Sequence, residues 1–358
     1  MPQALDGAQP SAGLTTLIGT LLFVLPLLVW YRYSEQIASS GGLFAFVEAA
    51  TGPTIARIQA GFWIFSYFLY LVYTVPFIAY DLVPVVFPQT TSYRLLIDVV
   101  LVVFVLAVML SPLIVTLSVT AIIAGSQLVI AVLLASLSLI HLGAPADAFV
   151  GQGNLAAVLQ GAGRISSLYV CASLPLFLGG EVRGGGTAVR RGLVWAFASV
   201  GALAVIAVFP LAHANASIIN SNLPGVSLAQ AFDGRAFVVL VGIGVAASVA
   251  GLIIAEFIAL SRLLGAVFKR PNRQMVLLIS ALFLIGSLIS LLNPTGAYSL
   301  LLKPSLIALW ISQVMVVAVY PWFVRHYRKV RVADAALAAA ASVVMLIGLY
   351  TAFASTGT

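Results

Sequence analysis

One side chain in this sequence stands out chemically, because it is an acid inside a long apolar stretch. Glu256 lies toward the end of FVVLVGIGVAASVAGLIIAEFIALSR, and Ser248 adds a hydroxyl to the same stretch. An ionisable side chain in such a setting is energetically costly, so it indicates a functional role. Burial would favour the neutral form, which suits an acid that carries a proton. The alternative is a structural ion pair between Glu256 and Arg262 or another base near the end of the stretch.

A group of aromatic residues recurs at helical spacing in YFLYLVY and just beyond it. Tyr67, Tyr70, Tyr73 and Phe77 follow one another at intervals of three or four residues, so they roughly share one helix face. Such a face could form the aromatic wall of a pocket for an apolar or amphipathic solute. The alternatives are ordinary helix packing and an aromatic belt at the membrane interface.

The stretch SSLYVCASLPLFLGGE, residues 166–181, combines apolar residues with elements that oppose a regular helix. Pro175 removes one backbone donor, and Gly179 and Gly180 add backbone freedom. The sequence therefore predicts a broken or kinked helix here. A proline-kinked helix that merely packs against its neighbours is the alternative.

Metal centres, disulfides and the common catalytic motifs are not expected. Cys171 is the sole cysteine, and His141, His213 and His326 lie far apart in sequence. An intramembrane enzyme would need clustered acids, bases or metal ligands in the bilayer, and the sequence shows none. We therefore expect no cofactor, no metal and no enzymatic activity.

The composition is that of a polytopic membrane protein. Of the 358 residues, 62% are hydrophobic and 8% are charged, whereas soluble proteins carry about a quarter charged residues. Apolar stretches of about 20 residues predict membrane-spanning helices, because that length crosses about 30 Å of hydrocarbon. Ten are predicted, at 14–31, 57–84, 94–112, 114–142, 166–181, 192–213, 236–263, 274–292, 297–323 and 333–354.

The basic residues support this count and give an orientation. Cytoplasmic loops collect Lys and Arg, and with the amino terminus outside, the loops after odd-numbered spans collect 13 of the 17 bases. These are Arg32, Arg57, Arg183, Arg190, Arg191, Arg262, Lys269, Arg270, Arg273, Arg325, Arg328, Lys329 and Arg331. The net charge of +7 is thus spread over loops, and no nucleic-acid partner is expected. Residues 213–235 are expected to form the longest external loop.

Several motifs resemble those of the amino acid–polyamine–organocation (APC) permeases. SEQIASSGGLFAFVEAATGP followed by ARIQAGFWIFSYFLY is similar to the family's loop between its second and third helices. GGEVRGGGTAVRRGL resembles the segment after the family's sixth helix, and ALSRLLGAVFKRPN resembles the end of its eighth. YPWFVRHYRK is similar to the basic end of the tenth.

The resemblance implies an all-α, LeuT-type fold built from two inverted repeats, with solute bound near the bilayer midplane between discontinuous helices. The family usually has twelve helices, and this chain aligns from the second to the eleventh. An incomplete first repeat is therefore expected, lacking the family's first broken helix, which a neighbouring protomer could supply in a homo-oligomer. The expected parts are an external leader at 1–13, a partial first repeat at 14–143, a second repeat at 166–323 and an extra helix at 333–354.

The resemblance also implies a site. The family's glycine-rich turn in the sixth helix aligns with Cys171, Ala172 and Ser173, so Tyr169, Cys171 and Ser173 are expected to face the ligand. Tyr67, Tyr70 and Ser248 join them as expected solute-binding residues. Some proton-coupled relatives carry a lysine where this chain has Gln127, so the coupling ion is left open between proton and sodium.

The implied function is that of a secondary transporter in the cell membrane, plasma or inner. It would move amino acids or related amines across the bilayer by alternating access. The alternative is a membrane protein that uses the permease scaffold to sense a solute or bind a partner without transporting anything.

Overall fold

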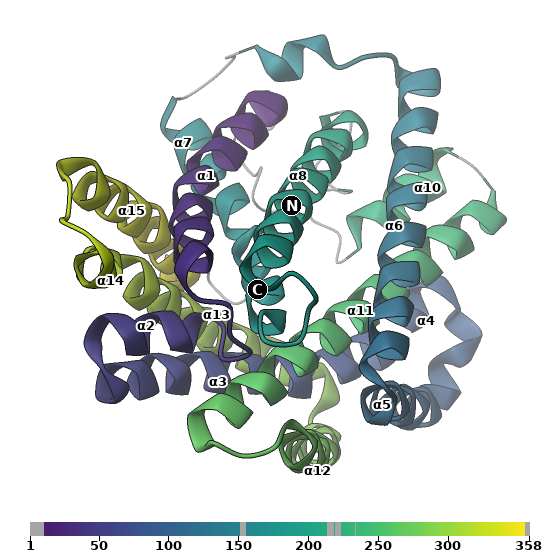
Figure 1. Cartoon of the computed structure of the whole chain (residues 1–358). Helices are drawn as coiled ribbons and strands as arrows, with labels where there is room; N and C mark the ends of the chain where they lie inside the picture. Colours follow the sequence, from purple (N-terminus) through teal and green to yellow (C-terminus); the bar gives the residue numbers. More distant parts are fainter. Residues whose placement is uncertain (1–10, 151–154, 213–217, 219–222, 233, 355–358) are drawn as a thin grey trace.

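The computed structural model describes residues 11–150, 155–212, 218, 223–232 and 234–354 (Figure 1). The predicted leader at 1–13 therefore lies mostly outside the described residues. Within them all regular structure is helical, and ten helical segments are long and apolar enough to cross a membrane. This confirms the all-α, multi-pass architecture, which follows because a helix satisfies its own backbone groups in hydrocarbon.

The elements follow one another from α1 to α15 with short 3₁₀ and π segments between them. They are α1 (Ala12–Gln36), α2 (Leu43–Thr51), α3 (Pro53–Pro76), the π-helix η3 (Phe77–Leu82), α4 (Val83–Val86), η4 (Pro88–Tyr93), α5 (Arg94–Leu110), α6 (Leu113–Leu142), η5 (Ala146–Phe149), α7 (Leu155–Ser167), η6 (Val170–Leu178), α8 (Gly185–Ala212), α10 (Pro224–Phe232), α11 (Arg235–Phe268), α12 (Asn272–Ser290), α13 (Pro294–Ala318), α14 (Tyr320–Tyr327) and α15 (Val332–Ala354).

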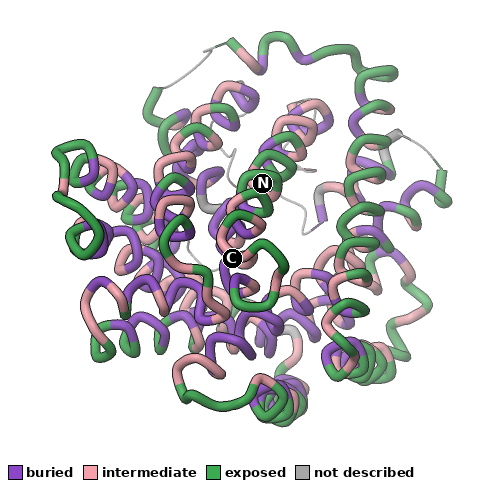
Figure 2. Tube along the Cα trace, viewed as in Figure 1, coloured by how far each residue is buried: buried purple, intermediate pink, exposed green. Residues whose placement is uncertain are grey.

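The helices pack around a centre to which α3, α11 and α13 contribute. α3 packs against α13 and α11, while α1 packs against α7, α8 and α15. α6 stands at one side of the bundle and α14 and α15 at the other (Figure 1). Buried residues gather where α3 crosses the bundle, and the outward faces of the peripheral helices are mostly exposed (Figure 2). Those exposed apolar faces suit a lipid environment.

One sequence expectation about a span boundary is wrong. The fifth span was expected from residue 166, but its first half is α7, which begins at Leu155. α7 carries Gln160, Arg164 and small residues, so the span Leu155–Leu178 has a mean hydropathy of only 1.2 and is weakly marked in the sequence. Residues 213–235 were expected to form an external loop, and 213–217, 219–222 and 233 lie outside the described residues. The described part contains α10, which packs against α11 and α6 and is not among the ten candidate spans.

Two glycine-rich loops meet on the side that the basic residues predict to be cytoplasmic. Gly42 has φ +52°, and a Cβ there would lie 2.5 Å from Cδ1 of Phe177 at the end of η6. A Cβ on Gly179 would lie 2.8 Å from the backbone nitrogen of Ser39. The SSGG and GGEVRGGG motifs therefore consist largely of residues with small side chains, because the two backbones lie in contact. This contact positions η6 against the α1–α2 connection.

An ion cluster fastens the first turn of α15 to the rest of the bundle. Asp334 is 1% exposed. Its carboxylate accepts hydrogen bonds from Arg32 of α1 at 3.0 Å and from both terminal nitrogens of Arg328 at 2.7 and 2.8 Å. The backbone N–H of Arg331 donates a fourth, at 3.0 Å. The carboxylate is thus fully satisfied although it is buried.

Replacing Asp334 by asparagine should therefore destabilise the protein by about 2–3 kcal/mol, the usual contribution of hydrogen bonds to a charged group. Arg32 and Arg328 are partly exposed, so the loss stays below that of a fully buried pair. Glu35→Gln is the matched control, because its pair with Arg190 is longer, at 3.5 Å, and exposed. The melting temperatures of both variants are measured by thermal unfolding in detergent. Equal melting temperatures for Asp334→Asn and Glu35→Gln would contradict the prediction.

Candidate functional site

The fifth span is interrupted near the middle of the chain. α7 ends at Ser167, Leu168 and Tyr169 form a turn, and η6 continues as a 3₁₀-helix over nine residues. Runs of 3₁₀-helix longer than three or four residues are uncommon and often mark a hinge or strain. The predicted break is therefore present, but the α-helix ends upstream of Pro175, which lies inside η6.

Tyr169 and Ser173 lie at this break, and both are buried. The hydroxyl of Tyr169 lies 2.6 Å from the hydroxyl of Thr20 on α1. Ser173 donates a hydrogen bond to the carbonyl oxygen of Val170 at 3.0 Å. Their polar groups are committed to the protein in this conformation, so their expected contact with a ligand stays a prediction. Ala172, also buried, adds no polar side chain.

Glu256 is the centre of a second group of expected residues. It is 3% exposed, and its Oε2 atom is buried without a hydrogen-bond partner among the described residues. Its carboxyl group interacts electrostatically with Cys171 of η6 and with Tyr67 and Tyr70 of α3. α3, η6 and α11 thus bring four of the expected residues together.

The structural alternative for Glu256 does not hold in this structure. Arg262, the next charged residue of α11, lies 2.7 Å from the carboxylate of Glu181, which follows η6. Among the described residues Glu256 makes no ion pair. A buried carboxyl group without a cation or a full set of hydrogen bonds is costly to keep, and an ion pair with Arg262 does not account for the position of Glu256.

Two aromatic rings, Trp63 and Phe177, pack against this group on the side that the basic residues predict to be cytoplasmic, and we call them the aromatic plug. The Trp63 ring stacks on Tyr67 at 3.6 Å between centroids, and Phe177 lies 4.7 Å from Trp63. Both plug residues are 0% exposed. Neither was singled out from the sequence, although Trp63 lies one helical turn before Tyr67.

Polar contacts between α3 and α13 were also missed. Gln59 donates to the hydroxyl of Ser312 at 2.8 Å, and Ser305 donates to the carbonyl oxygen of Ser66 at 2.8 Å. Gln313 is fully buried, with no partner for either amide atom among the described residues. The available indication was that Ser305 and Ser312 are seven residues apart, which places them on one helix face.

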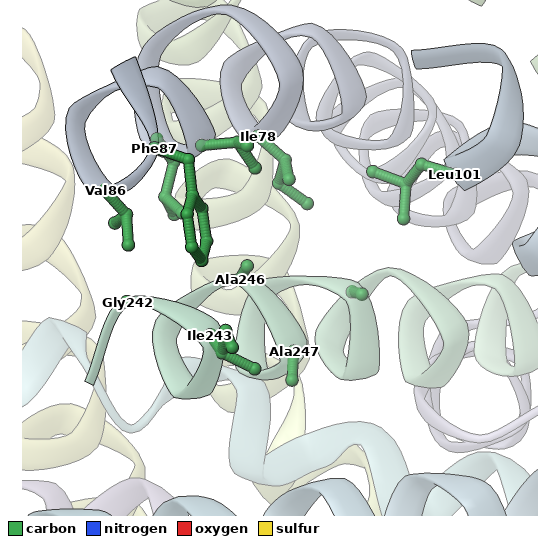
Figure 3. Close-up of a pocket in the computed structure, with 11 residues that line it drawn as sticks. Ile78, Val86, Phe87, Leu101, Gly242, Ile243, Ala246 and Ala247 are labelled. Atoms are coloured by element: carbon green, nitrogen blue, oxygen red, sulfur yellow. The ribbon is translucent and has the colours of Figure 1, made fainter. Parts of the chain in front are cut away.

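An apolar cavity of about 250 Å³ lies farther out, between η3, α4, α5 and α11. Side chains such as Ile78, Phe87, Leu101 and Ile243 line it, and Figure 3 shows no polar atom among the drawn side chains. A charged or zwitterionic solute would lose its hydration there without compensation. The cavity is therefore suited to alkyl groups, and we place the candidate site at Glu256 instead.

Ser248 lies on α11 two turns before Glu256 and is half-buried, and it does not line the apolar cavity. Its expected role in solute binding stays a prediction. Within the described part of the chain, no three His, Cys, Asp or Glu side chains come together in a way that could hold a metal ion.

No family model matches the sequence, and no curated protein matches it either. Among solved structures, the chain is similar to the crystal structure of an Eremococcus coleocola manganese transporter in complex with an aromatic bis-isothiourea substituted compound. The TM-score is 0.61 at 13% sequence identity, over 99% of this chain and 83% of that chain. At this identity the likeness shows the fold, and the chain accordingly has the LeuT-type transporter fold.

Proposed function

We propose that this chain is a secondary transporter that moves an amino acid or a related amine across a cell membrane, plasma or inner, by alternating access. The observation that carries the proposal is the interrupted span α7–η6 next to an unpaired buried carboxyl group. Discontinuous helices in such folds offer free backbone groups to a solute near the bilayer midplane. The aromatic faces of Tyr67 and Tyr70 would attract an ammonium group.

In this proposal Glu256 is the coupling acid. It binds a proton in one conformation and releases it in the other, while the break, Cys171 and the tyrosines hold the solute. The similar manganese transporter makes Mn²⁺ a second solute to test. A divalent cation would need convergent ligands, and the described residues supply no such group.

Cys171 makes the proposal testable without engineered cysteines, because it is the chain's sole thiol. Purified protein in proteoliposomes is assayed for counterflow of L-alanine, L-arginine, putrescine and Mn²⁺. We expect exchange of at least one amine-bearing solute, and that solute should slow labelling of Cys171 by N-ethylmaleimide at least fivefold. Cys171→Ser is the control for labelling elsewhere.

Two outcomes would contradict transport. Protection of Cys171 without counterflow would favour the alternative, a solute sensor built on the transporter fold. If none of the four solutes gives protection of Cys171 or counterflow, the assigned site is wrong. Exchange of Mn²⁺ alone would keep the transporter and overturn the amine substrate.

A further inference from the structure

A series of tyrosines connects Glu256 with the outer end of α3. Tyr70 and Tyr73 meet edge to face at 5.3 Å between ring centroids, and Tyr73 meets Tyr298 of α13 in the same way at 5.5 Å. Tyr67 continues the series one turn toward the cytoplasm, beside Glu256. We call the four residues Tyr67, Tyr70, Tyr73 and Tyr298 the tyrosine ladder.

The outer end of the tyrosine ladder has an acid beside it. Asp81 lies in the π-helix η3 and interacts electrostatically with Tyr298. The ring of Phe77 stacks on Tyr298 at 4.8 Å, which keeps η3 and α13 together. From Tyr67 to Asp81 the helix rises about 20 Å at 1.5 Å per residue, so the series covers the outer half of the membrane.

Asp81 and Tyr298 at the outer end are half-buried, as is Tyr70, whereas Tyr73 is 2% and Tyr67 is 1% exposed. The hydroxyls of Tyr67 and Tyr73 are buried, with the Cys171 thiol beside the first and the Ser305 hydroxyl beside the second, but neither makes a hydrogen bond of good geometry in the described structure. Unpartnered hydroxyls are costly in apolar surroundings, and they are the groups that bind internal water.

The cytoplasmic side differs in its chemistry. Below Tyr67 the next ring is Trp63 of the aromatic plug, and Phe177 lies beside it. A tyrosine hydroxyl both donates and accepts hydrogen bonds, whereas the indole N–H of tryptophan only donates and phenylalanine does neither. A proton can therefore be passed along hydroxyls but not across the plug.

We propose that the tyrosine ladder carries protons between Asp81 at the outer face and Glu256 at mid-membrane, while the aromatic plug closes the cytoplasmic side. Each hydroxyl oxygen, or a water between two of them, accepts a proton from the outer neighbour and releases its own to the inner one. The last proton bonds to a carboxylate oxygen of Glu256, and every tyrosine is left unchanged. The role of this proton path in coupling rests on the proposed transport function.

The surroundings of Glu256 make it the terminus of such a path. Tyr67, Tyr70 and Tyr73 of α3 and Cys171 of η6 lie within electrostatic range of its carboxyl group. On its own helix Arg262 is committed to Glu181. The charged residues of the other elements packed on α11, among them Glu48, Asp81, Asp98 and Arg273, make no ion pair with Glu256 in the described structure.

The test measures proton movement without any solute. Proteoliposomes on a solid-supported membrane receive a jump in external pH, and the transient current is recorded. We expect a transient in the wild type, none in Glu256→Gln, and one at least tenfold slower in Tyr73→Phe and Tyr298→Phe. Tyr93→Phe is the matched control, because Tyr93 lies at the outer end but is 60% exposed and outside the ladder.

Each tyrosine-to-phenylalanine change keeps the ring and its packing, and an unchanged melting temperature in detergent verifies folding. Tyr70→Phe replaces Tyr73→Phe if the latter is unstable. The proposal is overturned if the wild type gives no transient, if the transient survives in Glu256→Gln, or if Tyr73→Phe and Tyr298→Phe match Tyr93→Phe. Counterflow of solute, measured on the same liposomes, tests the transport function separately. Counterflow without a proton transient would overturn the proton path alone, and a proton transient without counterflow would overturn transport alone.

Discussion

Glu256→Gln is expected to abolish accumulation of the transported solute driven by a pH gradient. A gradient of one pH unit corresponds to about 1.4 kcal/mol, so coupling to one proton concentrates a neutral or zwitterionic solute about tenfold. The glutamine has the same shape but cannot bind and release the proton, and the accumulation ratio should fall to about one. Uptake into proteoliposomes with an acidic exterior measures the ratio directly.

The same variant should melt at a higher temperature than the wild type. Glu256 lacks both an ion pair and a partner for Oε2 in the described structure, and an amide removes the cost of burying a charge. Functional sites commonly sacrifice stability in this way. Glu48→Gln is the control, because Glu48 is exposed on α2, and it should change neither property. Undiminished accumulation by Glu256→Gln would show that the coupling acid lies elsewhere.

Gly42→Ala is expected to destabilise the protein more than Gly52→Ala or Gly61→Ala. At φ +52° and ψ −126° a side chain is strained, which costs about 1–3 kcal/mol. The added Cβ also meets Phe177 of the aromatic plug at 2.5 Å, and overpacking adds about 1–3 kcal/mol. Because Phe177 contacts Trp63, the substitution should also disturb the packing of the aromatic plug.

The two other glycines separate these contributions. Gly52 has φ +86° but nothing within 4 Å of its Cβ position, so Gly52→Ala reports the backbone strain alone. Gly61 lies inside α3 with nothing within 4 Å, so Gly61→Ala should be neutral or stabilise by up to about 1 kcal/mol. Thermal unfolding of the three variants in detergent should rank Gly61→Ala highest and Gly42→Ala lowest. Equal melting temperatures for the Gly42 and Gly52 variants would contradict the contact with Phe177.

Much of the fold was predictable from local sequence. Ten spans were expected and ten are present within the described residues, because each span must be a continuous apolar run of sufficient length. The fifth span was mislocated for the same reason. α7 contains Arg164 and several small residues, and its burial against α1 and α15 compensates for its low hydropathy.

The candidate site was predictable in its parts and not in its assembly. Glu256 was recognisable as an acid in an apolar run, and Tyr67 and Tyr70 as neighbours on one helix face. Trp63 and Phe177 are ordinary apolar residues in sequence, and only their stacking identifies them as a plug. Tyr298 is 225 residues from Tyr73, so no local pattern could connect the two.

By itself, the sequence determined that the chain is a bundle of membrane helices, which way it is expected to face, and that one span is interrupted. These properties depend on hydropathy, charge and backbone chemistry, which are local. The tertiary structure alone decided that Arg262 pairs with Glu181 and leaves Glu256 without a cation in the described structure. Arg262 pairs with Glu181 because α11 packs against η6 and α3. This packing brings together residues that are far apart in the chain, so no local sequence pattern shows it.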